Sequence, residues 1–341
     1  DIPGWNYKPH EYRLHREEHP AWIMVGSETE SCVSSRGEYY FPVERESDPL
    51  RPTLHVNSYD LSSPHWGYPP DTEFAAQQDN PFMLGQFVWT GFDYLGEPTP
   101  YKTEWPSRSS YFGIVDLCGF PKDRFYLYRS HWSLQPTLHL LPHWNWEGRE
   151  GEITPVHCYT SFDAAELFLN GRSLGVRRKD ADNEAERFRL VWDDVRYEPG
   201  ELRVVALGKD GKPALEKTVR TAGPAAALSL SLDRSGITAD GEDLAFVTVR
   251  VVDAEGTVCP KAGNPIQFGV SGPAEIAAVD NGDQTSVEPF QANRHKAFNG
   301  MCLVVLRSIE NNTGSVRLTA ESEGLAGAEI ELETQSSHGM V

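Results

Sequence analysis

Cysteine is scarce in this sequence and follows no pattern that indicates cross-linking. The five cysteines among 341 residues are far apart, odd in number and never arranged as C-x-x-C. These features argue against a disulfide framework, and each cysteine is best interpreted as a small buried apolar residue. Cysteine usage therefore leaves the compartment open. The five are Cys32, Cys118, Cys158, Cys259 and Cys302.

Basic residues are also in deficit, because 31 Lys and Arg face 50 Asp and Glu, for a formal net charge of −19. A chain this acidic repels phosphate backbones, so we expect no nucleic-acid partner. It contains no run of about 18 apolar residues, so no membrane span is expected. The first residues, DIPGWNYKPH, include neither a starting Met nor a signal-peptide pattern, and we expect a piece of a longer chain.

The sequence that is present is long enough for two or three domains, and its first part has an α/β texture. Up to about residue 140, apolar runs at 21–26 and 81–96 alternate with helix candidates at 9–20 and 121–133. Strand and helix in alternation indicate a parallel α/β sheet. An insert at 62–74, rich in Pro, Gly and aromatic residues, is predicted to be a loop at one rim of that sheet.

From about residue 150 the pattern changes to short strands joined by turns. Asn170-Gly171 and Asp210-Gly211 each lie between alternating runs, which predicts two β-hairpins in a small antiparallel sandwich. After a linker at 221–226, further strands at 244–256, 264–272, 301–308 and 314–324 predict a second sandwich. The domains predicted in this way are 1–145, 146–222 and 223–341.

Two carboxylates follow the first apolar strand, where packing has no use for them. Ala21–Val25 is apolar, and Glu28 and Glu30 come directly after it. A second polar cluster, the Trp- and His-rich stretch 131–148, places His139 and His143 four residues apart, but Pro142 forbids a regular helix there. We propose no metal residue and expect these aromatic side chains to pack the first domain against the next.

Several motifs together resemble one known family. They are GWNY (4–7), VGSETESCVSSRGEYY (25–40), GQFVWTGFDYLGEP (85–98) and LLPHWNWEGREG (140–151). This set resembles the end of the catalytic barrel in glycoside hydrolase family 2, in particular its bacterial β-galactosidase branch. The segments 159–175 and 237–256 are similar to the domains that follow the barrel in that family. The resemblance implies a partial (β/α)₈ barrel, comprising its last strands, followed by two immunoglobulin-like antiparallel β-sandwiches, the second of them adhesin-like.

The resemblance also implies roles for residues at the ends of barrel strands, where catalytic side chains lie in this fold. Glu28 is expected to be the nucleophile at the end of strand seven, and Tyr7, at the end of strand six, to orient it. Trp89 ends strand eight and is expected to stack on the apolar face of a sugar. Asn6, Asp93 and Glu97 are candidates for hydrogen bonds to sugar hydroxyls, although a turn role for Asn6 and structural pairing for the two acids stay open. Glu30 is expected to be a solvated charge at the rim.

The second catalytic carboxylate is the difficulty. In the family it belongs to an Asn-Glu pair at the end of strand four, and the pair Asn183-Glu184 lies between sandwich strands instead. A barrel needs about 250 residues, so the acid/base is expected upstream of Asp1, in the missing N-terminal part of the polypeptide.

The function expected from these observations is retaining hydrolysis of terminal β-linked sugars, with β-galactosides first. A β-glucuronidase or β-mannosidase is the alternative within the family, and Arg36 or Lys102 is a candidate cation for glucuronate. The alternative outside it is a non-catalytic carbohydrate-binding or adhesin-like module. No organic cofactor is expected. The expected partner is a β-linked oligosaccharide or a glycoside derived from a polysaccharide, and the family implies a periplasmic or secreted location.

Overall fold

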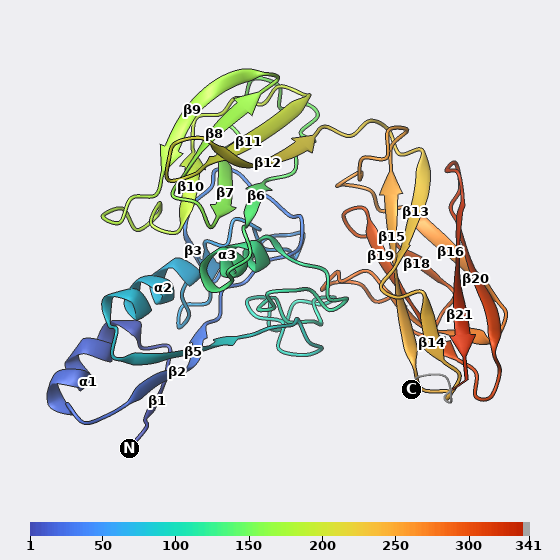
Figure 1. Ribbon diagram of the computed structural model, residues 1–341, viewed down its shortest axis with the longest axis horizontal. Coiled ribbons are helices and arrows are strands. Elements are labelled where there is room, and N and C mark those ends of the chain that lie inside the picture. Colours follow the sequence, from blue (N-terminus) through green and yellow to red (C-terminus); the bar gives the residue numbers. More distant parts are fainter. Residues whose placement is uncertain (337–341) are drawn as a thin grey trace. The chain divides into compact units, whose positions relative to one another are not determined.

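The computed structural model describes residues 1–336 and divides the chain into two compact units. Unit 1 is Asp1–Thr221 and unit 2 is Ala222–Val341. Figure 1 shows the helices in the first part of unit 1, whereas the rest of the described chain is built from strands and loops. Each unit has hydrophobic clusters of its own.

The first part of unit 1 contains short strands separated by helices. The elements are β1 (Gly4–Asn6), the 3₁₀ turn η1 (Pro9–Glu11), α1 (Tyr12–Glu18), β2 (Met24–Glu30), β3 (Glu46–Ser47), β4 (Ser62–Ser63), α2 (Pro70–Asp79), β5 (Met83–Trp89) and α3 (Asp123–Trp132). The predicted helices at 9–20 and 121–133 are confirmed. The predicted loop 62–74 is wrong in its second half, because Pro69-Pro70 starts α2 there, and Pro at the first helical position needs no N–H partner.

Three of these strands form the sheet that carries the motif residues. Their order is β1-β2-β5, and both pairs are parallel, as predicted. Helix α1 connects β1 to β2, and α2 lies on the connection between β2 and β5 (Figure 1). Tyr12 of α1 packs on Met24 and Met83 of the two neighbouring strands, which buries the start of the sheet.

The second part of unit 1 consists of two antiparallel sheets around one core. One sheet has the order β10-β7-β6 and the other the order β12-β11-β8-β9. The strands are β6 (Leu138–Leu141), β7 (Val156–Thr160), β8 (Ala164–Leu169), β9 (Arg172–Arg178), β10 (Arg189–Trp192), β11 (Glu201–Leu207) and β12 (Pro213–Arg220). Both predicted hairpins are present, and Asn170 and Gly171 adopt the positive φ values, 50° and 80°, that a two-residue turn of this kind requires.

Unit 2 is made of two further sheets that share one hydrophobic core. The sheet orders are β13-β15-β19-β17 and β14-β21-β20-β16-β18. Alternate residues of β15 point into the core, namely Ala245, Val247, Val249 and Val251. The strands are β13 (Ala227–Leu232), β14 (Gly236–Thr238), β15 (Leu244–Val252), β16 (Pro265–Ser271), β17 (Ala274–Asp280), β18 (Arg294–Lys296), β19 (Met301–Ser308), β20 (Gly314–Glu321) and β21 (Ala328–Gln335).

The cysteines are found mostly in the interior, where small apolar side chains are expected. All five cysteines lie in the described part of the chain without a disulfide, four of them buried and Cys118 half-buried. Within residues 1–336, no helix has both the length and the apolar character needed to cross a membrane.

Candidate active site

The carboxyl ends of β1, β2 and β5 bring the motif residues to one edge of the parallel sheet. Asn6, the last residue of β1, is aligned with Glu28 of β2. Trp89, the last residue of β5, is aligned with Glu30 at the end of β2. The backbone N–H of Tyr7 donates to the Glu28 carbonyl over 3.0 Å, so the chain just beyond β1 stays attached to β2.

Glu28 is half-buried and lies among hydrogen-bond donors. The Tyr7 hydroxyl donates a short hydrogen bond to Oε1 of Glu28. Nδ2 of Asn6 lies 3.5 Å from the other oxygen, Oε2, which leaves that oxygen only loosely held. Ser27 donates to Oδ1 of Asn6 over 2.8 Å and thereby sets which way the amide of Asn6 points.

Tyr7 is held in place from several directions. Its φ is 57°, in the left-handed region that turns its side chain back over β2. The hydroxyl of Ser31 donates to the Tyr7 oxygen over 2.9 Å, and the ring of Trp66 packs edge-on at 4.8 Å. Burial, followed by the hydrogen bond to Glu28, raises the pKa of Tyr7 well above its ordinary value of 10.0. The Tyr7 hydroxyl therefore remains a proton donor throughout the working pH range.

A second linked group contains Trp89 and Glu97. The indole Nε1 of Trp89 donates to the hydroxyl of Tyr94 over 3.1 Å, and Tyr94 in turn donates to Glu97 over 2.5 Å. The charge of Glu97 also helps to raise the pKa of Tyr7, so the two side chains interact electrostatically. Trp66 and Trp89 are both half-buried against one cluster that includes Phe112. Of the two indoles, Trp66 contacts Tyr7 directly, and Trp89 ends β5 beside the end of β2.

Asp93 does not fit the expectation that it binds a sugar hydroxyl. Its carboxylate is fully buried, forms an ion pair with Nζ of Lys122 at 2.7 Å and accepts the Gly113 N–H over 2.7 Å. Burial raises the pKa of Asp93 to about 6 and lowers that of Lys122 to about 8. Lys122 lies 29 residues further along the chain, so the motif 85–98 gave no sign of this partner. The geometry supports the structural pairing that the sequence had left open for Asp93.

Glu30 is also a correction, because it is not a solvated rim charge. It is 1% exposed, and neither carboxylate oxygen has a hydrogen-bond partner. The backbone of Glu30 has a φ of 68°, which turns the side chain away from the face of Glu28 that an extended strand would give it. Burial, with the nearby charge of Glu73, raises the pKa of Glu30 well above its ordinary value, while Arg124 opposes that shift.

Three residues of the site were not singled out in the sequence: Ser31, Trp66 and Tyr94. Trp66 lies in the aromatic-rich insert that was predicted only as a rim loop, so its composition was the available signal. Tyr94 lies inside the motif 85–98, three residues before its partner Glu97. Ser31 gave no signal, because its contact with Tyr7 depends on a left-handed backbone.

The histidines of the stretch 131–148 are used in packing and ion pairing. His139 contacts Asp123 at 2.6 Å and stacks on Tyr126 at 3.8 Å, and His143 stacks on Trp146 at 4.3 Å. Across residues 1–336, no group of three or more His, Cys, Asp and Glu side chains is arranged to hold a metal ion.

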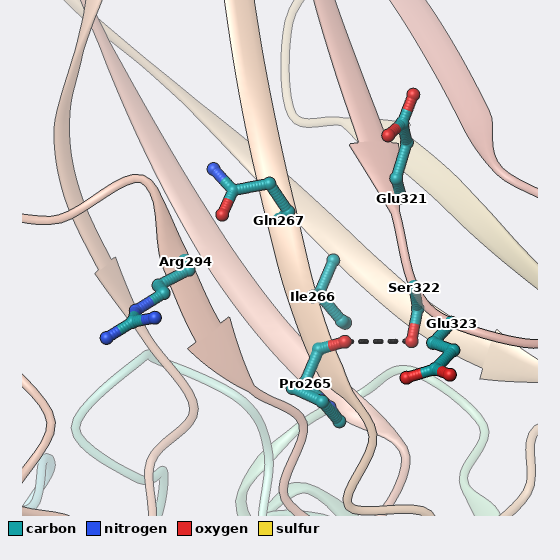
Figure 2. A pocket seen from close by; sticks show the side chains of 7 residues that line it. All are labelled: Pro265, Ile266, Gln267, Arg294, Glu321, Ser322 and Glu323. Carbon is teal, nitrogen blue, oxygen red and sulfur yellow. Dashed lines mark hydrogen bonds between the residues drawn. The ribbon is translucent and has the colours of Figure 1, made fainter.

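Unit 2 has a surface cavity of about 450 Å³, shown in Figure 2. Its floor is Ile266, and the exposed side chains of Arg294, Gln267 and Glu321 form a row across β18, β16 and β20. The hydroxyl of Ser322 donates a hydrogen bond to the Pro265 carbonyl over 2.8 Å. The lining contains neither an aromatic ring nor a nucleophile beside a base, so it lacks the features of the Glu28 site.

Comparisons with known proteins show which family the chain resembles. Residues 228–331 match the family model for the glycoside hydrolase family 2 C-terminal domain 5, and residues 151–215 match a domain of unknown function, DUF4982. The chain is 43% identical to the β-galactosidase BoGH2A of Bacteroides ovatus over 98% of its own length and 39% of that relative. It is 32% identical to a putative β-glucuronidase of Formosa agariphila over 62% of its length and 20% of the relative.

Among solved structures, the chain is also similar to a glycosidase. A crystal structure of a β-glycosidase from Bacteroides vulgatus superimposes with a TM-score of 0.86 at 30% identity, covering 98% of this chain and 45% of that one. The chain belongs to glycoside hydrolase family 2 and corresponds to the C-terminal part of its members. It spans less than half the length of the relatives that it matches.

Proposed function

We propose that this chain supplies the nucleophile side of the active site in a retaining β-galactosidase that hydrolyses terminal β-linked galactosides. Glu28 is the nucleophile, and Tyr7 orients it. The observation that carries the proposal is the short hydrogen bond from the Tyr7 hydroxyl to Oε1 of Glu28 at the carboxyl ends of two parallel strands. The relatives named as glycosidases support it.

The reaction proceeds by double displacement. Glu28 attacks the anomeric carbon through Oε2, its less strongly held oxygen, while Tyr7 keeps Oε1 in place. The bond from that carbon to the leaving oxygen breaks as a general acid protonates the oxygen. Water then attacks the glycosyl-enzyme, assisted by the same group acting as base, and Glu28 leaves with net retention of configuration. We place this acid/base upstream of Asp1, in a part of the protein outside these 341 residues.

The remaining site residues bind the sugar in this proposal. The half-buried indole of Trp89 offers its face to the apolar side of the ring, and Tyr94 fixes the plane of that indole. Glu97, which is exposed, and Asn6 accept or donate hydrogen bonds to ring hydroxyls. Asp93 has no part in binding, because Lys122 and Gly113 occupy its carboxylate.

A galactoside is favoured over a glucuronide by the state of the candidate cations. Arg36 donates from Nε to Asp116 over 2.6 Å and is 7% exposed, so its charge is committed to a buried partner. Lys102 remains exposed and is the candidate from this chain for a carboxylate-bearing sugar. β-Glucuronidase activity is thus the alternative, favoured by the names of several relatives.

The fold assignment is part of the same proposal. Residues 1–145 are the last strands of a (β/α)₈ barrel, and 146–222 and 223–341 are immunoglobulin-like sandwiches. The β1-α1-β2-α2-β5-α3 order supports the barrel. So does the apolar edge strand β5, on which Leu84 and Phe87 are each 69% exposed, as expected for a strand that the rest of a barrel covers. A periplasmic or secreted location completes the proposal, and fractionation of producing cells tests it.

The test uses the full-length protein that contains these residues. A 2-fluoro-β-galactoside, which slows hydrolysis of the glycosyl-enzyme, is expected to add one sugar to the peptide that holds Glu28, as detected by mass spectrometry. Glu28→Gln is expected to lower kcat by at least about 10⁴-fold. The matched control, Glu17→Gln, changes an exposed carboxylate of α1 and leaves kcat unchanged. Labelling at another residue, or an active Glu28→Gln variant, contradicts the proposal. Faster hydrolysis of the matching β-glucuronide selects the alternative.

A further inference from the structure

A directed chain of hydrogen bonds ends at the nucleophile. Tyr7 contacts both Ser31 and Glu28 through its single hydroxyl group. An ionised carboxylate only accepts hydrogen bonds, so the Tyr7 proton points at Glu28. The Tyr7 oxygen must then accept, and Ser31 must donate, across the 2.9 Å between them. The direction of the chain is therefore Ser31 to Tyr7 to Glu28.

We propose that Ser31 is a positioning residue for the nucleophile, which holds the Tyr7 hydroxyl so that its proton is directed at Oε1 of Glu28. This inference rests on the proposed function, because it concerns the same reaction. Without the donor at Ser31, the Tyr7 hydroxyl is free to rotate about its C–O bond, and Glu28 loses part of its orientation. Donation to the Tyr7 oxygen also polarises the O–H bond and strengthens the hydrogen bond that it makes.

The backbone around Ser31 is built to present this hydroxyl. Glu30 and Ser31 have φ values of 68° and 56°, a pair of left-handed residues that is uncommon outside glycine. The loop after β4 holds this turn, because the N–H of Tyr68 donates to the Glu30 carbonyl over 2.6 Å. Gly67 permits the approach, since a Cβ at this position would lie 2.6 Å from the Glu30 carbonyl oxygen and 3.2 Å from the Ser31 Cβ.

Burial separates this role from substrate binding. Ser31 is 0% exposed, whereas Glu28 and Tyr7 are only half-buried, so the sugar reaches the latter two and not Ser31. Ser31 therefore acts through Tyr7. Its removal is expected to slow the chemical step and to leave the binding of the sugar as it is.

The experiment measures inactivation of the full-length protein by the 2-fluoro-β-galactoside, which separates the affinity for the sugar from the rate of bond formation at Glu28. Ser31→Ala keeps the Cβ, and Ser31→Gly relieves the left-handed backbone; both remove the hydroxyl. Each variant is expected to reduce the rate constant for labelling by about 3- to 10-fold, the effect of one lost hydrogen bond. The inhibition constant for free galactose is expected to stay unchanged. Ser130→Ala, which removes a hydroxyl bonded only to the Leu127 carbonyl in α3, is the matched control without effect.

A double-mutant cycle tests whether Ser31 acts through Tyr7. In a Tyr7→Phe background the chain of hydrogen bonds from Ser31 to Glu28 is already interrupted. Ser31→Gly is therefore expected to cause no further decrease in the rate constant for labelling. An equal loss in both backgrounds, or a weaker affinity for galactose in the single variants, overturns the role of Ser31. A wild-type protein that is not labelled at Glu28 contradicts the proposed function instead, so the two failures are distinguishable.

Discussion

The core of unit 2 and the interior of unit 1 around the candidate active site contain different kinds of buried side chains. The core of unit 2 includes Val247, Val304 and Leu306 at 0% exposure, and the acidic, basic and His side chains that the described part of unit 2 buries are Asp253 and His295. In unit 1, charged side chains are buried as pairs, and the ion pair between Lys122 and Asp93 is 0% exposed on both sides. Three similar pairs are Arg36–Asp116, Arg124–Asp60 and Arg189–Asp71.

This difference in buried side chains affects both the stability of each region and how precisely its chain is held in place. An apolar core gains free energy from every buried methylene and needs no exact partner for each side chain. A buried ion pair gives little net stability, but each partner becomes indispensable to the other. Around the site, such pairs fix irregular loops that contain little regular structure, as Lys122 does by donating to the carbonyls of Ser34 and Tyr111.

The largest effect on stability is expected where a buried charge loses its partner. Lys122→Met removes the ammonium group that is paired with the buried Asp93 carboxylate, and we expect unit 1 to lose about 3–5 kcal/mol. Lys122→Met combined with Asp93→Asn removes both charges, keeps the acceptor for Gly113 and is expected to recover much of that loss. Hydrogen exchange of unit 1 peptides in the full-length protein measures both changes, because a multidomain protein has no single unfolding free energy. Equal losses in the single and double variants would show that the charge of Asp93 is not what matters.

A conservative exchange in the core of unit 2 is expected to have a smaller effect than in unit 1. Leu306→Ala is expected to cost about 2–5 kcal/mol, but Leu306→Ile, which keeps the volume, less than about 1.5 kcal/mol. In unit 1, the equally conservative Lys122→Arg places a larger planar head in a site fitted to an ammonium group, so we expect it to cost more than Leu306→Ile. Hydrogen exchange of peptides from each unit checks the order. The two unit 2 variants are expected to be labelled at Glu28 like the wild type, since Tyr7, Ser31 and Glu28 all belong to unit 1.

The same contrast explains how much could be predicted from the sequence. In unit 2, β15, β16 and β20 follow from alternation, because one face of each is buried, and β19 follows from its apolar run. The sequence did not predict β13, β14, β17, β18 and β21. The hairpin at Asn170-Gly171 follows from a local backbone requirement. In these regions, neighbours along the chain carry the information.

Around the site the information lies in contacts between distant segments. Glu28 and Tyr7 were predicted from a resemblance, and the structure brings them together, although their roles stay predictions. The partner of Asp93 is 29 residues away, and the orientation of Glu30 depends on one left-handed φ angle. Neither residue leaves a periodic trace. The sequence left sugar binding and structural pairing open for Asp93 and suggested a solvated charge for Glu30, and both residues are buried.

The smallest expected effect concerns Glu30, a buried carboxyl group of unit 1 without a hydrogen-bond partner for its side chain. The charged groups that influence it are Glu73 and Asp71 of α2 and Arg124 of α3. Burial raises its pKa in the folded protein above the ordinary value of 4.5. Above that pH the unfolded chain releases the proton while the folded protein still holds it. The contribution of Glu30 to stability is therefore fully present below about pH 4.5 and is lost as the pH rises toward its folded-state pKa.

Glu30→Gln removes this titration without changing the size of the side chain. The unfolding free energy of the wild type minus that of the variant is expected to fall from pH 4.5 upward, by at most about 1.4 kcal/mol per pH unit. Asp60 and Asp93, whose pKa values burial raises to about 7 and about 6, titrate in both proteins and cancel in the difference. Glu17→Gln on the surface of α1 is expected to give a flat difference. Hydrogen exchange of the β2 peptide, corrected for the intrinsic effect of pH on exchange, provides the measurement. A difference that does not change with pH for Glu30→Gln would mean that Glu30 is ionised in the folded protein. In that case Arg124, rather than burial, would determine the pKa of Glu30.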